Sequence, residues 1–165
     1  LHTNGFTLAR SALNLDGDPA AVRRLLSERP FDSTDTLGEL LLRPHRSYLP
    51  AVLPLLEREL VTGMAHITGG GIVGNVGRII PNGLVAEIDV DAWAPTQIFD
   101  LIQERGSIRA SEMFRVFNMG VGFVTIVRPD DADESLATMS DARVIGRVAS
   151  TNDRTRVRLN GLKDG

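Results

Sequence analysis

Residues 64–81 read MAHITGGGIVGNVGRIIP, and this stretch sets the organisation of the chain. A short apolar run over residues 65–68 meets three consecutive glycines, Gly69, Gly70 and Gly71. Glycine loses more conformational entropy on folding than any other residue, so stability does not explain three together. They favour close approach of the backbone to a ligand, or backbone angles that only glycine tolerates. We predict a strand, a glycine loop and a short helix, whose free N–H groups suit phosphate.

Two well-known phosphate-binding motifs do not fit this stretch. The glycines satisfy G-x-G-x-x-G, but the dinucleotide fingerprint belongs to a βαβ unit of roughly 30 residues. Here the helix has to fit between Gly71 and a strand that begins near Leu84, and Gly77 interrupts it. A P-loop needs Gly-Lys-Ser/Thr after the loop, and none follows. The match to the dinucleotide motif is therefore rejected, and only the general anion-binding geometry is retained.

The rest of the chain alternates between helical and extended patterns. Helices are expected within residues 2–15, 18–30, 34–44, 47–61, 94–106, 111–117 and 131–139. Strands are expected near 65–68, 84–90, 120–128, 142–149 and 155–160, with 120–128 as a central strand because it is continuously apolar. Thr3 and Asn4, Asp18 and Ser111 are candidate helix caps. The prediction is an α+β, layered α/β/α domain in which helices pack on one mixed sheet.

Composition limits what the chain can do. Its 165 residues, 42% apolar and 24% charged, fit one soluble globular domain. A net charge of -3 gives no basic field for nucleic acid, and no apolar run approaches the roughly 20 residues of a membrane span. Without cysteine there is no disulfide or thiolate chemistry. Because Leu1 opens the chain, we expect a piece of a longer polypeptide.

Four stretches carry a family resemblance: AHITGGGIVGNVGRIIP, IFDLIQERGSIRASEMFRVFNMGVGFVTIV, LHTNGFTLAR and TLGELLLRPHRSYLP. Together they resemble the C-terminal half of the aminoimidazole ribonucleotide synthetases, also called phosphoribosylformylglycinamidine cyclo-ligases. Their order and spacing match across nearly the whole chain. The wider superfamily includes formylglycinamidine ribonucleotide synthetase, selenophosphate synthetase, thiamine monophosphate kinase and a hydrogenase maturation factor. FNMGVG after a Glu-Met helix favours the cyclo-ligase branch.

The resemblance implies that residues 1–165 are the C-terminal domain of a two-domain cytoplasmic enzyme. The N-terminal domain, absent here, would supply most of the ATP site, the Mg²⁺ carboxylates and the homodimer interface. The reaction is ATP-dependent closure of formylglycinamidine ribonucleotide to aminoimidazole ribonucleotide in purine biosynthesis. Such chemistry depends on positioning and charge neutralisation. The present chain alone is expected to be inactive, and no metal ligand is expected within it.

The resemblance also implies roles for particular residues. His66 and His2 are the catalytic candidates. The residues expected to bind the substrate or its phosphate are Thr3, Asn4, Thr68, Gly69, Gly70, Gly71, Asn75 and Arg78. The anion cradle is expected at the N–H groups around Gly70, Gly71 and Ile72. A plainer interpretation stays open for each: His66 as a satisfied core histidine, Thr3 and Asn4 as helix caps, and the glycines as a tight turn.

The sequence departs from the family motifs at two places. After the three glycines the family usually has Glu-Asn and then Pro-Arg, where this chain has Gly74-Asn75 and Gly77-Arg78. The motif usually written Pro-Thr-Arg-Ile-Tyr is here PHRSY, with His45 in place of threonine. Roles of the missing glutamate and threonine are not carried over.

Two other classes of function remain open on the sequence alone. One is a free-standing module that binds a phosphorylated small molecule without catalysis. The other is a different enzyme of the superfamily, such as a small-molecule kinase or an amidotransferase-type synthetase. A preceding segment rich in paired aspartates would favour an enzyme.

Overall fold

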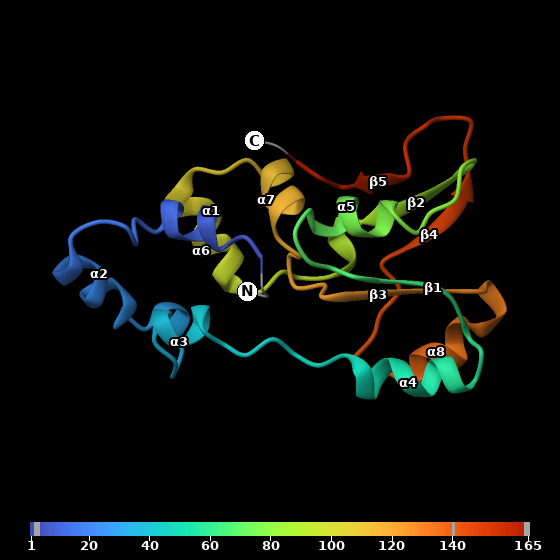
Figure 1. The fold of residues 1–165 in the computed structure, drawn as a ribbon, viewed down its shortest axis with the longest axis horizontal. Coiled ribbons are helices and arrows are strands. Elements are labelled where there is room, and N and C mark those ends of the chain that lie inside the picture. The colour runs from blue at the N-terminus through green and yellow to red at the C-terminus, as the bar shows by residue number, and fades with distance from the viewer. Residues whose placement is uncertain (2–3, 140, 164–165) are drawn as a thin grey trace.

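A computed structural model describes residues 1, 4–139 and 141–163 of the chain (Figure 1). The α-helices are α1 (Phe6–Ala12), α2 (Pro19–Leu26), α3 (Leu37–Leu41), α4 (Leu49–Glu57), α5 (Gly71–Gly77), α6 (Gln97–Gly106), α7 (Ala110–Val116) and α8 (Ala132–Thr138). The strands are β1 (Val61–His66), β2 (Leu84–Asp89), β3 (Phe123–Val127), β4 (Gly146–Ser150) and β5 (Val157–Asn160). Three 3₁₀ turns cover Pro30–Asp32, Val90–Ala92 and Pro129–Asp131. The α+β class predicted from the sequence is confirmed.

The strands form two sheets, where the sequence predicted one. β1 pairs with β3 antiparallel, and a three-stranded mixed sheet has the order β4-β2-β5, with β2–β4 antiparallel and β2–β5 parallel. Helix α5 lies between the two sheets and contacts both β1 and β5 (Figure 1). Residue patterns predict that a strand exists, but they do not predict which strand it pairs with. The helix after the glycine loop lies against a strand of each sheet.

The expectation of a fully buried central strand at 120–128 is corrected by the structure. β3 is half-buried along its whole length and has a single partner, β1. One face packs Val124 and Ile126 against the core. The other face carries Phe123, whose ring lies 5.5 Å from that of Tyr48 between centroids. A continuous apolar run is typical of burial on both faces, but here the second face is only partly covered.

The core is one cluster of buried side chains from α1, α3, α5, α6 and α7 and from the strands β1, β2 and β5. Ile67, Ile72, Ile102 and Met113 are completely buried there. Trp93 is buried as well, and its Nε1–H donates to the Met119 carbonyl at 2.8 Å, so it acts as a core residue. Among the described helices, none is long and apolar enough to cross a membrane.

The predicted helix starts are confirmed in part. The carboxylate of Asp18 accepts from the N–H groups of Ala20 and Ala21, as expected of an N-cap. The predicted cap at Ser111 is wrong, because α7 begins one residue earlier with Arg109 at its N-cap. At α1 the N-cap residue is Gly5, and Thr3 lies outside the described residues.

Gly71 begins α5 and fixes the contact between α5 and α7. Its φ is 61°, and it is buried against the end of α7. A methyl group at this position would overlap the carbonyl oxygen of Phe114 and lie 3.0 Å from that of Phe117. Only glycine satisfies both the left-handed backbone and this close approach. The third glycine of the loop therefore serves packing rather than ligand access.

We predict that Gly71→Ala lowers the free energy of unfolding by at least about 2 kcal/mol, since it combines backbone strain with a steric overlap. Gly69→Ala is the matched control, because no atom lies within 4 Å of its added methyl and its φ is not in the left-handed region. It should change stability by no more than about 0.5 kcal/mol. Urea unfolding of both variants measures the difference. Equal midpoints would contradict the packing role of Gly71.

Candidate functional site

The glycine loop joins β1 to α5, as the sequence predicted. Thr68 is half-buried, whereas Gly69 and Gly70 are exposed. Gly70 has a φ of 96°, a left-handed conformation that favours glycine. The space next to Gly69 is open for at least 4 Å in the direction of a side chain. The first two glycines thus leave backbone accessible, in contrast to the buried Gly71.

Asn75 organises this loop from inside the protein. The residue is 5% exposed, and its Nδ2 donates to three carbonyl oxygens: Thr68 at 3.2 Å, Gly69 at 3.2 Å and Gly71 at 2.8 Å. In a planar trans peptide the N–H points opposite to the C=O. The N–H groups that follow these carbonyls therefore point away from Asn75. They belong to Gly69, Gly70 and Ile72.

The N–H groups without a hydrogen-bond acceptor among the described residues differ by one residue from the expected set. The Gly71 N–H already donates to the Thr68 carbonyl at 3.1 Å, so it is not available to a ligand. The N–H groups of Gly69, Gly70 and Ile72 donate no hydrogen bond to any other described residue. We call these three N–H groups the amide cradle. The sequence predicted where the donors would lie but could not show that the turn consumes one of them.

Arg78 and Thr68 both hydrogen-bond to the side chain of Asn75. The Asn75 Oδ1 accepts from the Arg78 guanidinium at 3.3 Å and from the Thr68 hydroxyl at 3.4 Å. Asn75 therefore acts as a buried support of the loop, since its side chain faces the loop carbonyls. Arg78 is exposed and keeps further N–H donors for an anion near the loop.

The N-terminal segment and the glycine loop both contact the C-terminal end of α7. Asn4 Nδ2 donates to the Val116 carbonyl at 2.6 Å, in the last turn of α7, against which Gly71 also packs. Asn4 is thus tied to α7 and does not cap α1. His2 and Thr3 lie outside the described residues, so their expected roles stay predictions.

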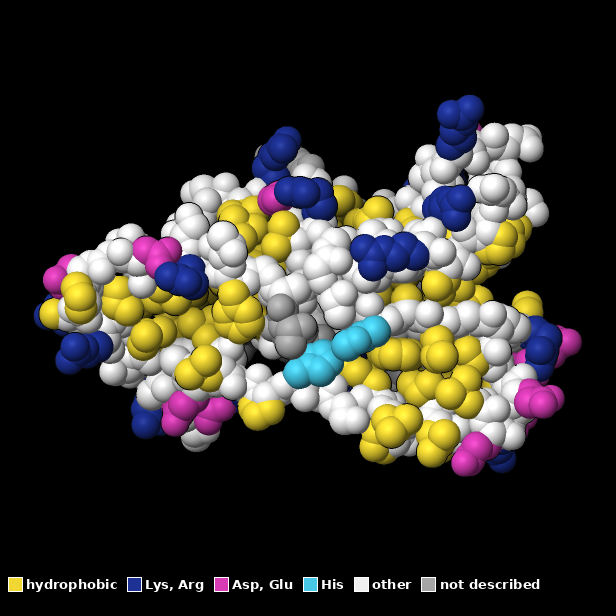
Figure 2. All heavy atoms as spheres, in the orientation of Figure 1, with side chains coloured by type: hydrophobic (Ala, Val, Ile, Leu, Met, Phe, Trp, Pro, Cys, Tyr) yellow, Lys and Arg dark blue, Asp and Glu magenta, His cyan; other side chains and the backbone are white. Residues whose placement is uncertain are grey.

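His66 lies in a cluster of rings at the end of β1. It is exposed, which excludes the interpretation as a core histidine, and its Nε2 lies 3.0 Å from the Nε2 of His45. The rings of Tyr48 and Phe123 each lie 6.0 Å from the His66 ring. Figure 2 shows the two imidazoles side by side on the surface. The sequence drew attention to His45 only as a departure from a motif.

Arg46 and Asp141 flank this cluster. They form an ion pair, and the Arg46 guanidinium lies 5.5 Å from the Tyr48 ring centre. The hydrogen bond from Arg46 holds the pKa of the Asp141 carboxyl below its usual value. Burial raises the pKa of Tyr48, with a smaller opposing effect from Arg46. Tyr48 is therefore a neutral hydrogen-bonding ring at physiological pH.

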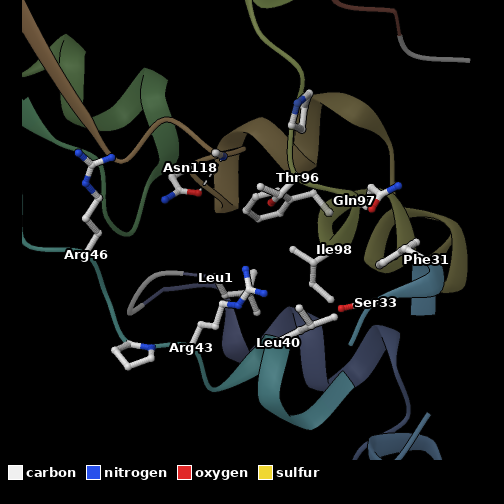
Figure 3. A pocket seen from close by; sticks show the side chains of 14 residues that line it. Leu1, Phe31, Ser33, Leu40, Arg43, Arg46, Thr96, Gln97, Ile98 and Asn118 are labelled. Atoms are coloured by element: carbon white, nitrogen blue, oxygen red, sulfur yellow. Dashed lines mark hydrogen bonds between the residues drawn. The ribbon is translucent and has the colours of Figure 1, made fainter. Parts of the chain in front are cut away.

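A cavity of about 500 Å³ lies between α3, the segment before α4 and the start of α6 (Figure 3). Arg43 and Arg46 line one side, and Thr96 and Gln97 at the start of α6 line the other. Asn118 is 3% exposed at its wall, where its Oδ1 accepts from the Gly120 N–H at 3.1 Å. The sequence did not predict this cavity, because its walls come from segments that are far apart in the chain.

No group of three or more possible metal-binding His, Asp or Glu side chains occurs within residues 1, 4–139 and 141–163. What these residues offer is a set of hydrogen-bond donors: the amide cradle, the arginines and the histidine pair. Such a set suits binding and charge stabilisation of an anionic group.

Comparisons with known proteins identify the family of the chain. The chain is 42% identical over 142 residues to a phosphoribosylformylglycinamidine cyclo-ligase from Bifidobacterium animalis subsp. lactis, covering 86% of this chain and 40% of that protein. It is 41% identical over 153 residues to a protein of the same name from Bacillus cereus, covering 90% of this chain and 42% of that protein. The chain thus spans about two-fifths of the length of these relatives.

A solved structure shares the fold. It is thiamine-monophosphate kinase from Stenotrophomonas maltophilia, with a TM-score of 0.54 and 19% sequence identity over 98% of this chain and 48% of that one. At this identity the likeness concerns the fold alone. The family described as "AIR synthase related protein, C-terminal domain" matches residues 1–158, and the chain therefore belongs to that family.

Proposed function

We propose that this chain is the C-terminal part of a cytoplasmic, ATP-dependent cyclo-ligase that converts formylglycinamidine ribonucleotide to aminoimidazole ribonucleotide in purine biosynthesis. The observation that carries the proposal is sequence similarity. The chain is 42% and 41% identical to two cyclo-ligases, over 86% and 90% of its length. In this reaction the formyl oxygen is phosphorylated by ATP, a nitrogen attacks the same carbon, and phosphate leaves. Phosphorylation turns a poor leaving oxygen into a good leaving group.

The amide cradle has the role of binding a phosphate group of the substrate or the nucleotide. The three N–H groups are unpaired among the described residues and held in place by Asn75; those of Gly69 and Gly70 belong to exposed residues, whereas Ile72 is buried. Because they belong to a rigid backbone, they need no reorganisation when charge develops on an oxygen. Arg78 adds a mobile positive charge beside the cradle. The net charge of -3 makes such a local concentration of donors necessary for an anionic ligand.

His66 has the role of a proton donor or acceptor near the reacting group. Its exposed imidazole lies three residues before Gly69, on the strand that leads into the loop. We propose the same role, as a proton donor or acceptor, for His2. ATP and Mg²⁺ would be held mostly by the part of the relatives that this chain does not span, and that part is also the proposed homodimer interface.

An exposed apolar face is the proposed contact surface for the N-terminal domain. Leu49, Leu53 and Leu56 of α4 are 65%, 44% and 39% exposed, and Met64 of β1 is 45% exposed. The three leucines lie on α4, at the lower right of Figure 1, where Figure 2 shows hydrophobic side chains gathered beside the histidine pair. Contiguous exposed apolar surface is typical of an interaction site. We propose that the N-terminal domain of the enzyme covers it.

The alternative functions, a small-molecule kinase and a binding module, differ from a cyclo-ligase in the products they form. A small-molecule kinase would transfer phosphate to its substrate without closing a ring, and a binding module would release no phosphate from ATP. Assay of the complete protein with ATP and formylglycinamidine ribonucleotide separates the three. Substrate-dependent phosphate release together with a closed imidazole ring is the outcome expected of a cyclo-ligase.

Substituting His66 tests its role in that assay. We expect His66→Gln to lower kcat by about 10²–10⁴, the contribution typical of a general acid or base. Thr62→Ser is the matched control, because Thr62 lies four residues earlier on the same strand, is also exposed and is not part of the apolar face. It should leave kcat near the original value. An equal loss in both variants would assign the effect to the surface rather than to the imidazole.

Substituting Gly69 tests the amide cradle without disturbing the fold. Gly69→Val places bulk in open space beside the cradle, so it should keep the unfolding midpoint. It should weaken binding of ribose 5-phosphate by about tenfold or more, because one charge-assisted hydrogen bond contributes about 1.5–3 kcal/mol. The measurement is an NMR titration that follows the amides of Gly69, Gly70 and Ile72.

Gly74→Val is the control for this titration, since Gly74 also borders open space but is not in the cradle. It should bind like the original chain. If other amides shift while residues 69–73 stay still, the cradle is in the wrong place. If no amide shifts at millimolar ligand, the chain has no preformed phosphate site of its own.

A further inference from the structure

The cavity between α3 and the start of α6 is large enough for a small molecule and is separate from the amide cradle. Its volume of about 500 Å³ lies within the range of about 300–1,000 Å³ that is typical of small-molecule sites. Gly69, Gly70 and Ile72 do not line it. No Asp or Glu is among the described residues of its wall, so no negative charge on the wall opposes an anionic ligand.

Asn118 brings an unpaired hydrogen-bond donor to this wall. The residue is 3% exposed, and its Oδ1 accepts from the Gly120 N–H at 3.1 Å. Its Nδ2 donates no hydrogen bond to any described residue. Leaving a buried donor without an acceptor costs free energy, and native proteins rarely do so. An acceptor atom of a ligand in the cavity would satisfy this Nδ2.

The start of α6 adds backbone donors to the same cavity. The N-cap residue is Thr96, whose side chain accepts no capping hydrogen bond. The N–H groups of Gln97 and Ile98 donate to no described residue, whereas the Phe99 N–H donates to the Thr96 carbonyl at 2.9 Å. These four residues all line the cavity. Free N–H groups and the positive end of a ten-residue helix favour an anionic group here.

Two arginines add positive charge across the cavity from α6. Arg43 pairs with Asp35 at 2.6 Å, and Arg46 pairs with Asp141. Neither carboxylate belongs to the cavity wall. Because a guanidinium has five N–H donors, each arginine keeps donors beyond those in its ion pair. Guanidinium groups bind phosphate with paired hydrogen bonds, so this set of donors suits a phosphate group.

The other end of the cavity is apolar. Figure 3 shows Arg46 and Asn118 at one end, and Phe31, Leu40 and Ile98 toward the other. The Phe31 side chain is 38% exposed, and its φ of 62° is a strained conformation for a bulky residue. An exposed aromatic ring at a cavity is suited to stacking against a planar ring of a ligand. The ligand therefore has an anionic end and a planar, less polar end.

We propose that this cavity binds a nucleoside monophosphate. Its phosphate accepts hydrogen bonds from Asn118 Nδ2, from the N–H groups at the start of α6 and from the two arginines. Its base stacks on Phe31, and the polar side chains of Ser33 and Gln97, which also line the cavity, bind the edge of the base. Such binding does not depend on the proposed cyclo-ligase reaction, because the site performs no chemistry.

The experiment is an NMR titration of this chain with adenosine 5′-monophosphate. The side-chain amide of Asn118 and the backbone amides of Gln97 and Ile98 should shift. Asn118→Asp keeps an oxygen for the Gly120 N–H but replaces the donor with a negative charge, and it should weaken binding by about tenfold or more. Phe31→Leu removes the stacking ring and should weaken binding by about fivefold or more.

Two control variants separate this site from other surfaces. Phe6→Leu is matched to Phe31→Leu, because Phe6 is 37% exposed and does not line the cavity. It should bind adenosine 5′-monophosphate like the original chain. Gly69→Val, which changes the amide cradle, should leave the shifts of the Asn118 side chain unchanged.

Backbone amide spectra establish that each variant is folded. The proposal is overturned if the signals of Asn118, Gln97 and Ile98 stay still at millimolar adenosine 5′-monophosphate, even when the amides of the glycine loop shift. It is also overturned if adenosine binds the cavity as tightly as its monophosphate, since the phosphate is then not recognised. Unchanged binding by folded Asn118→Asp or Phe31→Leu would equally contradict it.

Discussion

The hydrogen bonds from the Asn75 amide to the carbonyls of Thr68, Gly69 and Gly71 are the interaction on which the rest of the site depends. They fix the direction of three peptide planes at once. Because the carbonyls face a buried side chain, the corresponding N–H groups point away from it, and those of Gly69 and Gly70 belong to exposed residues. A buried amide that lost these bonds would pay a desolvation cost of about 1–3 kcal/mol, so the fold and the loop are stabilised together.

The end of α7 extends this arrangement to the remainder of the molecule. Gly71 packs on its carbonyls, and Asn4 donates to its Val116 carbonyl. Helix α5 starts at the same point and separates the two sheets. The glycine loop thus lies where α5, the end of α7 and the N-terminal segment meet. Positioning of this kind is what phosphate chemistry demands of a protein.

Much of the fold could be predicted from local pattern. The amphipathic repeat at 94–106 and the Asp18 cap gave α6 and α2, because short-range spacing determines both. The pairing of β1 with β3 could not be predicted, since it joins segments that are about 60 residues apart. The degree of burial of β3 could not be predicted either, because it depends on what covers the second face of the strand.

The candidate site was predictable in position but not in detail. The run of glycines indicated an exposed loop, yet the separate roles of Gly69 and Gly71 depend on α7, which lies about 40 residues later. Asn75 resembled a ligand contact because its motif is shared, but its burial makes it a support. The proximity of His45 to His66 has no local signal at all, since tertiary structure alone brings them together.

Hydrogen exchange of the loop amides tests the central claim most directly. The Gly71 amide should exchange slowly because it is bonded to Thr68, whereas those of the exposed Gly69 and Gly70 should exchange rapidly. In Asn75→Ala the protection of Gly71 should be lost while the amides of the β1–β3 ladder stay protected. Slow exchange at Gly69 and Gly70 in the original chain, or protection of Gly71 that survives the loss of Asn75, would contradict the account.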